Sequence, residues 1–127
     1  METMNATQKA AYLKSELRNF YGTGTWFRHS LFRKFLYTEG VQFLAEEACA
    51  YWLIDLIFGF QYDQQPVRDE PFQTWDLIVT EQQTAALQCG DGNGNIVFTH
   101  SLNYTDFPLD KIRLFFTDNV LLLTTEW

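Results

Sequence analysis

Apolar and polar residues repeat with two different periods along this chain. Up to about residue 60, apolar residues recur every three or four positions, which is typical of amphipathic helices. From Phe72 onward they recur every second position, which is typical of strands. The change of period predicts an α+β protein. We expect an antiparallel β-meander of about five strands in the C-terminal half, packed against a long central helix and an N-terminal helix.

The helical half contains two predicted helices. The first covers residues 6–21, with Asn5 as N-cap and Gln8 at the capping-box position. The second covers residues 39–60, with Thr38 as its cap, and becomes apolar nearly all round after Ala48. Such a helix must be covered on every side, so we expect the rest of the chain to pack around it. Residues 26–37 fit neither period, and we expect an extended segment ending in a short strand over residues 33–37.

The sheet is predicted to follow a polar loop at residues 61–71. Its expected strands cover residues 72–79, 84–89, 96–104, 111–117 and 120–125. Residues 90–95 read as a hairpin loop, and Asp118 with Asn119 as a two-residue turn suited to positive φ. Residues 1–127 then form a single domain. Its core is expected to include Trp52, Leu53, Leu56, Trp75, Leu77, Leu87, Phe98 and Leu114.

Composition adds a charge asymmetry to this picture. The net charge is −7, yet residues 1–37 carry six Lys and Arg against two Glu, a net +4. Residues 38–127 carry three Lys and Arg against fourteen Asp and Glu, a net −11. The two parts can attract each other within the domain, or the acidic part can attract a basic protein partner. The twelve Phe, six Tyr and four Trp can fill a core without a cofactor, and none is expected.

The expected setting is the cytoplasm. The N-terminal residues are polar and lack the apolar segment of a signal peptide. No uncharged stretch of 18 residues is present, so we expect no membrane span. The two cysteines, Cys49 and Cys89, lie far apart and are expected to be reduced, with Cys49 a small buried hydrophobe in the central helix.

Asp55 is the candidate acid, because it lies within the most apolar stretch of the central helix. Its natural counter-charges are Arg28, His29 and Arg33, and a structural ion pair is the simplest explanation. A small enzyme with a site built from Arg28, His29 and Asp55 is the functional alternative. His100, on the apolar side of its strand, is a further candidate, either as a core histidine or as a general base.

The spacing of the candidate ligands argues against a metal site, and the acidic charge argues against a nucleic-acid partner. Cys49, Cys89, His29 and His100 include no close pair that could begin a zinc site. Residues 91–95 resemble the start of an EF-hand loop, but Ile96 occupies the glycine position and Leu102 the glutamate position. We therefore expect a hairpin and no metal site. Residues 28–34 mix basic and aromatic residues as nucleic-acid patches do, but the acidic remainder argues against that partner.

Five stretches resemble an uncharacterised family of small bacterial proteins. They are residues 28–30 (RHS), 37–41 (YTEGV), 50–55 (AYWLID), 91–94 (DGNG) and 104–108 (YTDFP). The resemblance implies a bacterial origin, an association with mobile elements and a cytoplasmic setting. It implies no activity, cofactor or catalytic residue.

No complete catalytic motif is present in the sequence, so the leading expectation is a non-catalytic interaction or regulatory protein. Its acidic face would bind a basic protein partner. The strand at residues 111–117 and its neighbour carry apolar residues on both faces, which is more than one helix can cover. We therefore expect either the first helix or a second copy on the second face of the sheet, and favour a symmetric homodimer.

Overall fold

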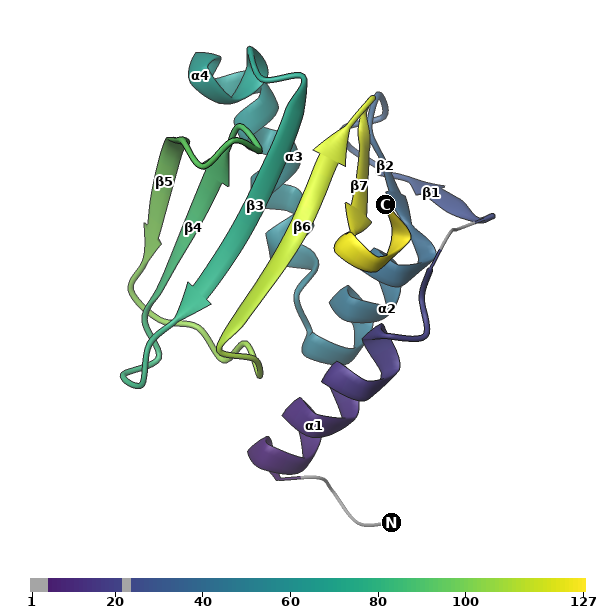
Figure 1. Cartoon of the computed structure of the whole chain (residues 1–127), viewed down its shortest axis with the longest axis vertical. Helices are drawn as coiled ribbons and strands as arrows, with labels where there is room; N and C mark the ends of the chain where they lie inside the picture. Colours follow the sequence, from purple (N-terminus) through teal and green to yellow (C-terminus); the bar gives the residue numbers. More distant parts are fainter. Residues whose placement is uncertain (1–4, 22–23) are drawn as a thin grey trace.

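The computed structural model describes residues 5–21 and 24–127 and places a seven-stranded sheet against a layer of helices (Figure 1). In chain order the elements are α1 (Ala6–Leu17), β1 (Trp26–Arg28), β2 (Leu36–Thr38), α2 (Glu39–Ala48), α3 (Tyr51–Asp63), α4 (Gln65–Arg68), β3 (Phe72–Val79), β4 (Ala85–Gly90), β5 (Ile96–Leu102), β6 (Lys111–Thr117), β7 (Val120–Leu123) and the short 3₁₀ helix η1 (Thr124–Glu126). Among these residues, no helix has the length and apolar character needed to cross a bilayer.

The strand order is β1-β2-β7-β6-β3-β4-β5, and all neighbours pair antiparallel except the parallel pair β2 and β7. The predicted α+β fold is thus confirmed. The described sheet has two strands beyond the five expected. Strands β3, β4 and β5 follow one another as a meander, and β6 then returns to the free side of β3. Strand β3 therefore has neighbours on both sides and lies near the middle of the sheet.

The strands of the C-terminal half follow the period-two pattern closely. Asp118 and Asn119, with φ of 51° and 65°, join β6 to β7 as the turn residues predicted. The short strand expected at residues 33–37 is β2, and its partner β1 was not foreseen. A strand of three residues is too short to show the alternation of apolar and polar residues. β2 is stabilised by pairing with β7, which is distant in the sequence.

The prediction of one helix over residues 39–60 is wrong, because the helix is interrupted at Cys49 and Ala50. Cys49 adopts the left-handed conformation (φ 53°, ψ 46°), and the N–H groups of both residues donate to the carbonyl oxygen of Ala45. Cys49 is exposed, which corrects the expectation that it is buried. The stretch that is apolar nearly all round lies in α3, where Leu53, Ile54, Ile57 and Phe58 are buried and Trp52, Leu56 and Phe60 pack half-buried beside them.

α3 lies across one face of the sheet, here called the inner face (Figure 1). The ring of Phe58 lies 5.9 Å from Phe116, and the ring of Phe60 stacks 6.1 Å from Trp75. Of the predicted core, Leu53, Trp75, Leu77, Leu87 and Leu114 are buried, and Trp52, Leu56 and Phe98 are only half-buried. The polar loop expected at residues 61–71 is mostly helical, because α3 runs on to Asp63 and α4 follows it.

Side-chain caps fix the ends of α1 and α2. The Asn5 side chain accepts from the N–H of Gln8 at 2.8 Å, and the Gln8 side chain accepts from the N–H of Asn5, so the predicted capping box is confirmed. At α2, Thr38 accepts from the N–H of Val41 and donates to Glu126 at 2.6 Å. The buried carboxylate of Glu126 thus ties the C-terminal 3₁₀ helix to the positive end of α2.

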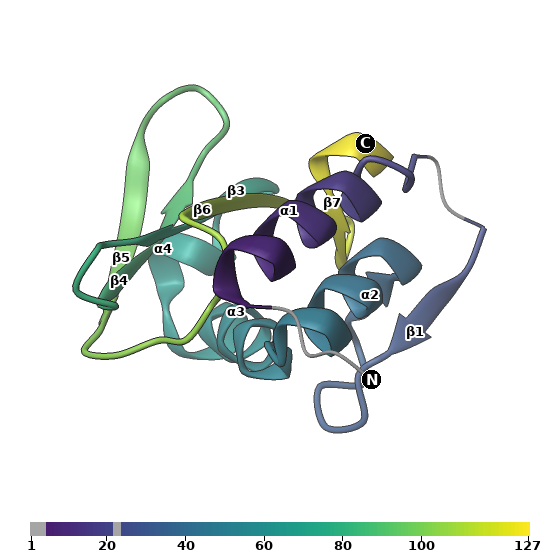
Figure 2. The same ribbon diagram turned by 90° about the horizontal axis from the view of Figure 1, so that it is seen from below.

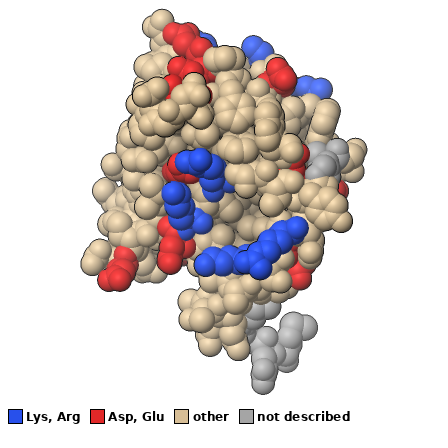
Figure 3. All heavy atoms as spheres, viewed as in Figure 1, with Lys and Arg blue, Asp and Glu red and all other residues tan. Residues whose placement is uncertain are grey.

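The opposite face of the sheet, here called the outer face, is seen in Figure 3, where Lys and Arg side chains gather in the middle and lower part. On it Arg113 donates two hydrogen bonds of 2.7 Å to Asp76, which raises the pKa of the guanidinium. The rings of Phe72, Phe115 and Trp127 form a cluster with centroids 5.1–6.0 Å apart. α1 packs instead beside α2 (Figure 2). The ring of Tyr12 in α1 lies 6.5 Å from that of Phe43 in α2.

Candidate functional site

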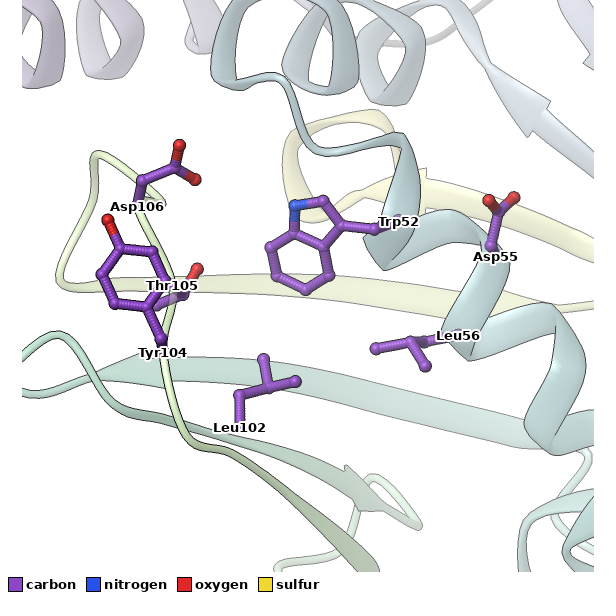
Figure 4. Close-up of a pocket in the computed structure, with 7 residues that line it drawn as sticks. All are labelled: Trp52, Asp55, Leu56, Leu102, Tyr104, Thr105 and Asp106. Atoms are coloured by element: carbon purple, nitrogen blue, oxygen red, sulfur yellow. The ribbon is translucent and has the colours of Figure 1, made fainter.

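A cavity of about 530 Å³ opens between α3 and the segment that connects β5 to β6 (Figure 4). This pocket is lined by Trp52, Asp55, Leu56, Leu102, Tyr104, Thr105 and Asp106. In Figure 4 the indole of Trp52 lies between Asp55 on the helix side and Asp106 on the loop side. Two segments that are far apart in the sequence therefore form one concave site.

The helix wall follows from helical spacing. Trp52, Asp55 and Leu56 occupy positions i, i+3 and i+4, so they share one face of α3. Another face of the helix is fixed in the core through Ile54, Ile57 and other buried residues. Because that packing sets the rotation of α3, the three lining residues are held at the rim of the sheet.

The loop wall is held by its backbone and by buried neighbours. The N–H of Thr105 donates to the carbonyl oxygen of Gln83 at 2.8 Å, and the hydroxyl of Thr105 accepts from the N–H of Phe107 at 3.2 Å. Phe107 and Leu109 are buried in the core. Tyr104, 66 % exposed, and Asp106, also exposed, therefore project from an anchored segment.

The second feature of the site is the contact between His29 and Asp55, 2.6 Å between Nε2 and Oδ1. The other ring nitrogen, Nδ1, accepts from the N–H groups of Leu31 and Phe32 at 3.0 Å each. These partners assign the proton to Nε2, which donates to the carboxylate. The side chain of Asp55 is 60 % exposed, so the carboxylate has one fixed partner and stays open to solvent.

The remaining candidate residues do not join this pair. The guanidinium of Arg28 donates to the backbone carbonyl of Arg33, and the Arg28 side chain is exposed. His100 lies on the inner face of β5, with its ring 5.2 Å from Phe60, and is not part of the pocket lining. Of the enzyme-like set Arg28, His29 and Asp55, the structure brings together the last two.

The hairpin loop and the cysteines have local structural roles. Asp91 accepts from the N–H groups of Asn93 and Asn95 and from the Asn95 side chain, whose hydrogen bond contributes most to lowering its pKa. Cys89 is buried, which raises the pKa of its thiol to about 12. Within the described residues, no group of three or more His, Cys, Asp or Glu side chains is placed to hold a metal ion.

Sequence reasoning missed most of the pocket. It assigned Trp52 and Leu56 to the core and did not single out Tyr104 or Asp106. A signal was nevertheless present, because residues 50–55 and 104–108 are two of the stretches on which the family resemblance rests. Residues 28–30, a third such stretch, supply the histidine that contacts Asp55.

Comparison with known proteins identifies a family and no activity. A family model described as a family of unknown function (DUF6876) matches residues 11–127. The chain therefore belongs to this uncharacterised family, as the resemblance implied. No curated protein and no solved structure matches the chain. A functional proposal must accordingly rest on the chemistry of the site.

Proposed function

We propose that this member of the family is a non-catalytic interaction protein of the bacterial cytoplasm that binds a basic protein partner. A Lys or Arg side chain of that partner would occupy the pocket between α3 and the β5–β6 connection. One observation carries the proposal: Asp55 and Asp106 contribute carboxylates to opposite walls of a cavity that also contains Trp52 and Tyr104.

The mixed lining matches the two ends of a long basic side chain. Leu56, Leu102 and the aromatic rings offer apolar surface to the methylene groups, as Lys and Arg stems require. The aromatic faces attract a cation by about 0.5–2 kcal/mol. The carboxylates accept its hydrogen bonds, and such charge-assisted bonds are stronger than neutral ones. A neutral or acidic side chain would satisfy fewer of these groups.

The charge distribution supports the same partner chemistry. Residues 38–127, which supply every lining residue, carry the net −11. A net negative charge raises the rate at which the protein encounters positively charged partners. Salt screens this attraction and lowers that rate. A basic partner would therefore be attracted at long range and then fixed by the pocket.

The test is a titration of the ¹⁵N-labelled protein with short blocked peptides that carry one Lys, one Arg or one Gln. We expect the cationic peptides to shift the amide signals of residues 52–56 and 102–106, and the Gln peptide to bind at least about fivefold more weakly. Asp55→Asn and Asp106→Asn should each weaken the binding of the cationic peptides. Asp55→Asn keeps an acceptor for His29, so it removes charge without removing that contact.

Asp63→Asn is the matched control, because Asp63 is an exposed acid on the same helix outside the pocket lining. It should leave binding nearly unchanged. If Asp63→Asn and Asp106→Asn weaken peptide binding equally, the effect comes from net charge alone, and the proposed binding in the pocket is refuted. A pull-down with the whole chain, repeated at high salt, would then identify the natural partner.

One observation favours the alternative of a small enzyme, namely the short contact between His29 and Asp55. Its weakness is that both ring nitrogens already have partners, so His29 has no free lone pair to act as a base. Arg28 is also directed to a backbone carbonyl. The geometry therefore supports the binding role better, with the His29–Asp55 contact positioning the carboxylate.

We further propose that two copies associate as a symmetric homodimer through the outer face. The supporting observation is the aromatic cluster of Phe72, Phe115 and Trp127, in which Trp127 is 70 % exposed. Such an aromatic patch is typical of an interface. Light scattering at micromolar concentration should give the mass of two chains, and Trp127→Lys the mass of one. A single-chain mass for the unmodified protein would refute the dimer.

A further inference from the structure

β5 forms one edge of the sheet and lacks most of the features that usually protect an edge. It is seven residues long and contains no Lys, Arg, Asp, Glu or Pro. Its register with β4 shifts at Val97, between the partners of Cys89 and Gly90, and is regular from Phe98 to Leu102. In Figure 1 no described element lies outside it. The other edge strand, β1, has three residues and carries Arg28. Natural proteins shorten, charge or bend exposed edges to prevent pairing with other chains, so β5 is available for pairing.

The pocket begins where this edge strand ends. Leu102, the last residue of β5, lines the pocket, and the chain continues into Tyr104, Thr105 and Asp106. Phe98 and His100 precede Leu102 on the inner face of β5, and both rings contact Phe60 of α3. Both are half-buried. α3 and α4 therefore cover the inner face along β5 only in part, and Leu102 at the end of β5 joins this face to the pocket.

From this arrangement we infer that the partner binds by strand addition: an extended segment pairs with the free edge of β5 and directs a Lys or Arg into the pocket. The inference rests on the proposed function and adds the form of the ligand. A strand beside β5 would lie about 4.8 Å away, and its residues on the inner face would recur every 7 Å or so, two residues apart. The basic residue would lie opposite Leu102, with apolar residues two and four positions away opposite His100 and Phe98.

This register predicts a pattern in the partner's sequence. Read in one direction it is apolar-x-apolar-x-basic, and in the other basic-x-apolar-x-apolar. A shift of the basic residue by a single position would place it on the outer side of the added strand, away from Asp106. Simple ionic attraction would not distinguish these two sequences. The pattern therefore separates strand addition from binding of a cation alone.

The experiment uses two pairs of blocked peptides with Gly-Ser flanks, each pair identical in composition. The in-phase peptides contain Val-Thr-Val-Thr-Lys or Lys-Thr-Val-Thr-Val, and the shifted peptides contain Val-Thr-Val-Lys-Thr or Thr-Lys-Val-Thr-Val. We expect one in-phase peptide to bind at least about tenfold more tightly than its shifted partner. Amide hydrogen exchange in its presence should slow at alternate residues of β5, because an added strand bonds every second residue.

Asp106→Asn and the control Asp63→Asn complete the design. Equal binding of in-phase and shifted peptides, with loss in Asp106→Asn, would overturn strand addition and leave the cation pocket standing. An in-phase preference that Asp106→Asn does not alter would keep strand addition and overturn the pocket. Absence of binding by all four peptides would overturn both proposals. The inference is upheld when the in-phase preference, the β5 protection and the Asp106 dependence occur together.

Discussion

Gln73, the second residue of β3, is the residue whose replacement we expect to destabilise the fold most for its size. It is 1 % exposed, and its amide exchanges two hydrogen bonds of 2.8 and 2.9 Å with Gln61 of α3. Its side-chain oxygen also accepts from the indole N–H of Trp75, and its NH₂ group donates to the carbonyls of Val67 and Glu70. One side chain thus joins β3 to α3 and to the segment around α4.

Gln73→Leu keeps the approximate volume and removes every one of these partners. The Trp75 indole N–H and the Gln61 side-chain oxygen are then buried without a hydrogen bond. An unsatisfied buried group costs about 1–3 kcal/mol, so we expect a loss of about 4 kcal/mol in the free energy of unfolding. Gln61→Leu should cost only about 1 kcal/mol, because Gln73 keeps Trp75, Val67 and Glu70 as partners.

Urea unfolding of the two single variants and the double variant, followed by circular dichroism, measures these free energies. The double variant should cost about 1–3 kcal/mol less than the sum of the single variants, because Gln61 no longer leaves an orphaned oxygen. Equal losses for Gln61→Leu and Gln73→Leu, or strict additivity, would refute this account of the network.

Three further predictions concern the helix break, the thiols and the C-terminal cap. Cys49→Gly should raise the melting temperature, since glycine relieves a left-handed conformation that costs other residues about 1 kcal/mol; a lower melting temperature would contradict this. A thiol reagent at neutral to mildly alkaline pH should modify Cys49 rapidly, and Cys89, whose pKa is raised to about 12 by burial, only after denaturation; two fast thiols would contradict it. Glu126→Ala should lower the urea midpoint by the equivalent of about 1–3 kcal/mol, because the N–H of Leu123 and the Thr38 hydroxyl lose their acceptor; an unchanged midpoint would show that η1 does not stabilise α2.

The strands could be predicted from sequence because their signals are local. Alternation of apolar residues over six to eight positions marks β3, β4 and β6, and the Asp118–Asn119 pair tolerates the positive φ that a two-residue turn requires. The capping box at α1 is equally local. In each case the sequence signal lies within one element, although pairing with neighbouring strands stabilises the strands themselves.

The helix break, strand β1 and the pairing of the expected short strand β2 with β7 could not be predicted, because their causes are distant in the sequence. Neither glycine nor proline marks the left-handed residue at Cys49, and the break follows from the different surfaces that α2 and α3 cover. Strand β2 exists because β7, near the other end of the chain, pairs with it in parallel. A three-residue segment contains no period that would announce such a partner.

The candidate site divides in the same way, and the division explains why residues that line the pocket were assigned to the core. A carboxylate in an apolar helix requires a counter-group, so charge alone predicted a partner for Asp55 among Arg28, His29 and Arg33 but could not select His29. The pocket depends on how far α3 extends across the sheet. No local sequence pattern predicts that tertiary arrangement. Trp52, Leu56 and Leu102 are as apolar as core residues, yet the fold leaves them half-covered. Uncovered apolar surface forgoes about 25 cal/mol for every Å² that folding could have buried. A ligand that covers this surface recovers that free energy on binding, and the adjacent carboxylates restrict which ligand can do so. Under the proposed function, the half-buried apolar residues beside the exposed carboxylates of Asp55 and Asp106 are therefore the surface from which the ligand gains its binding free energy.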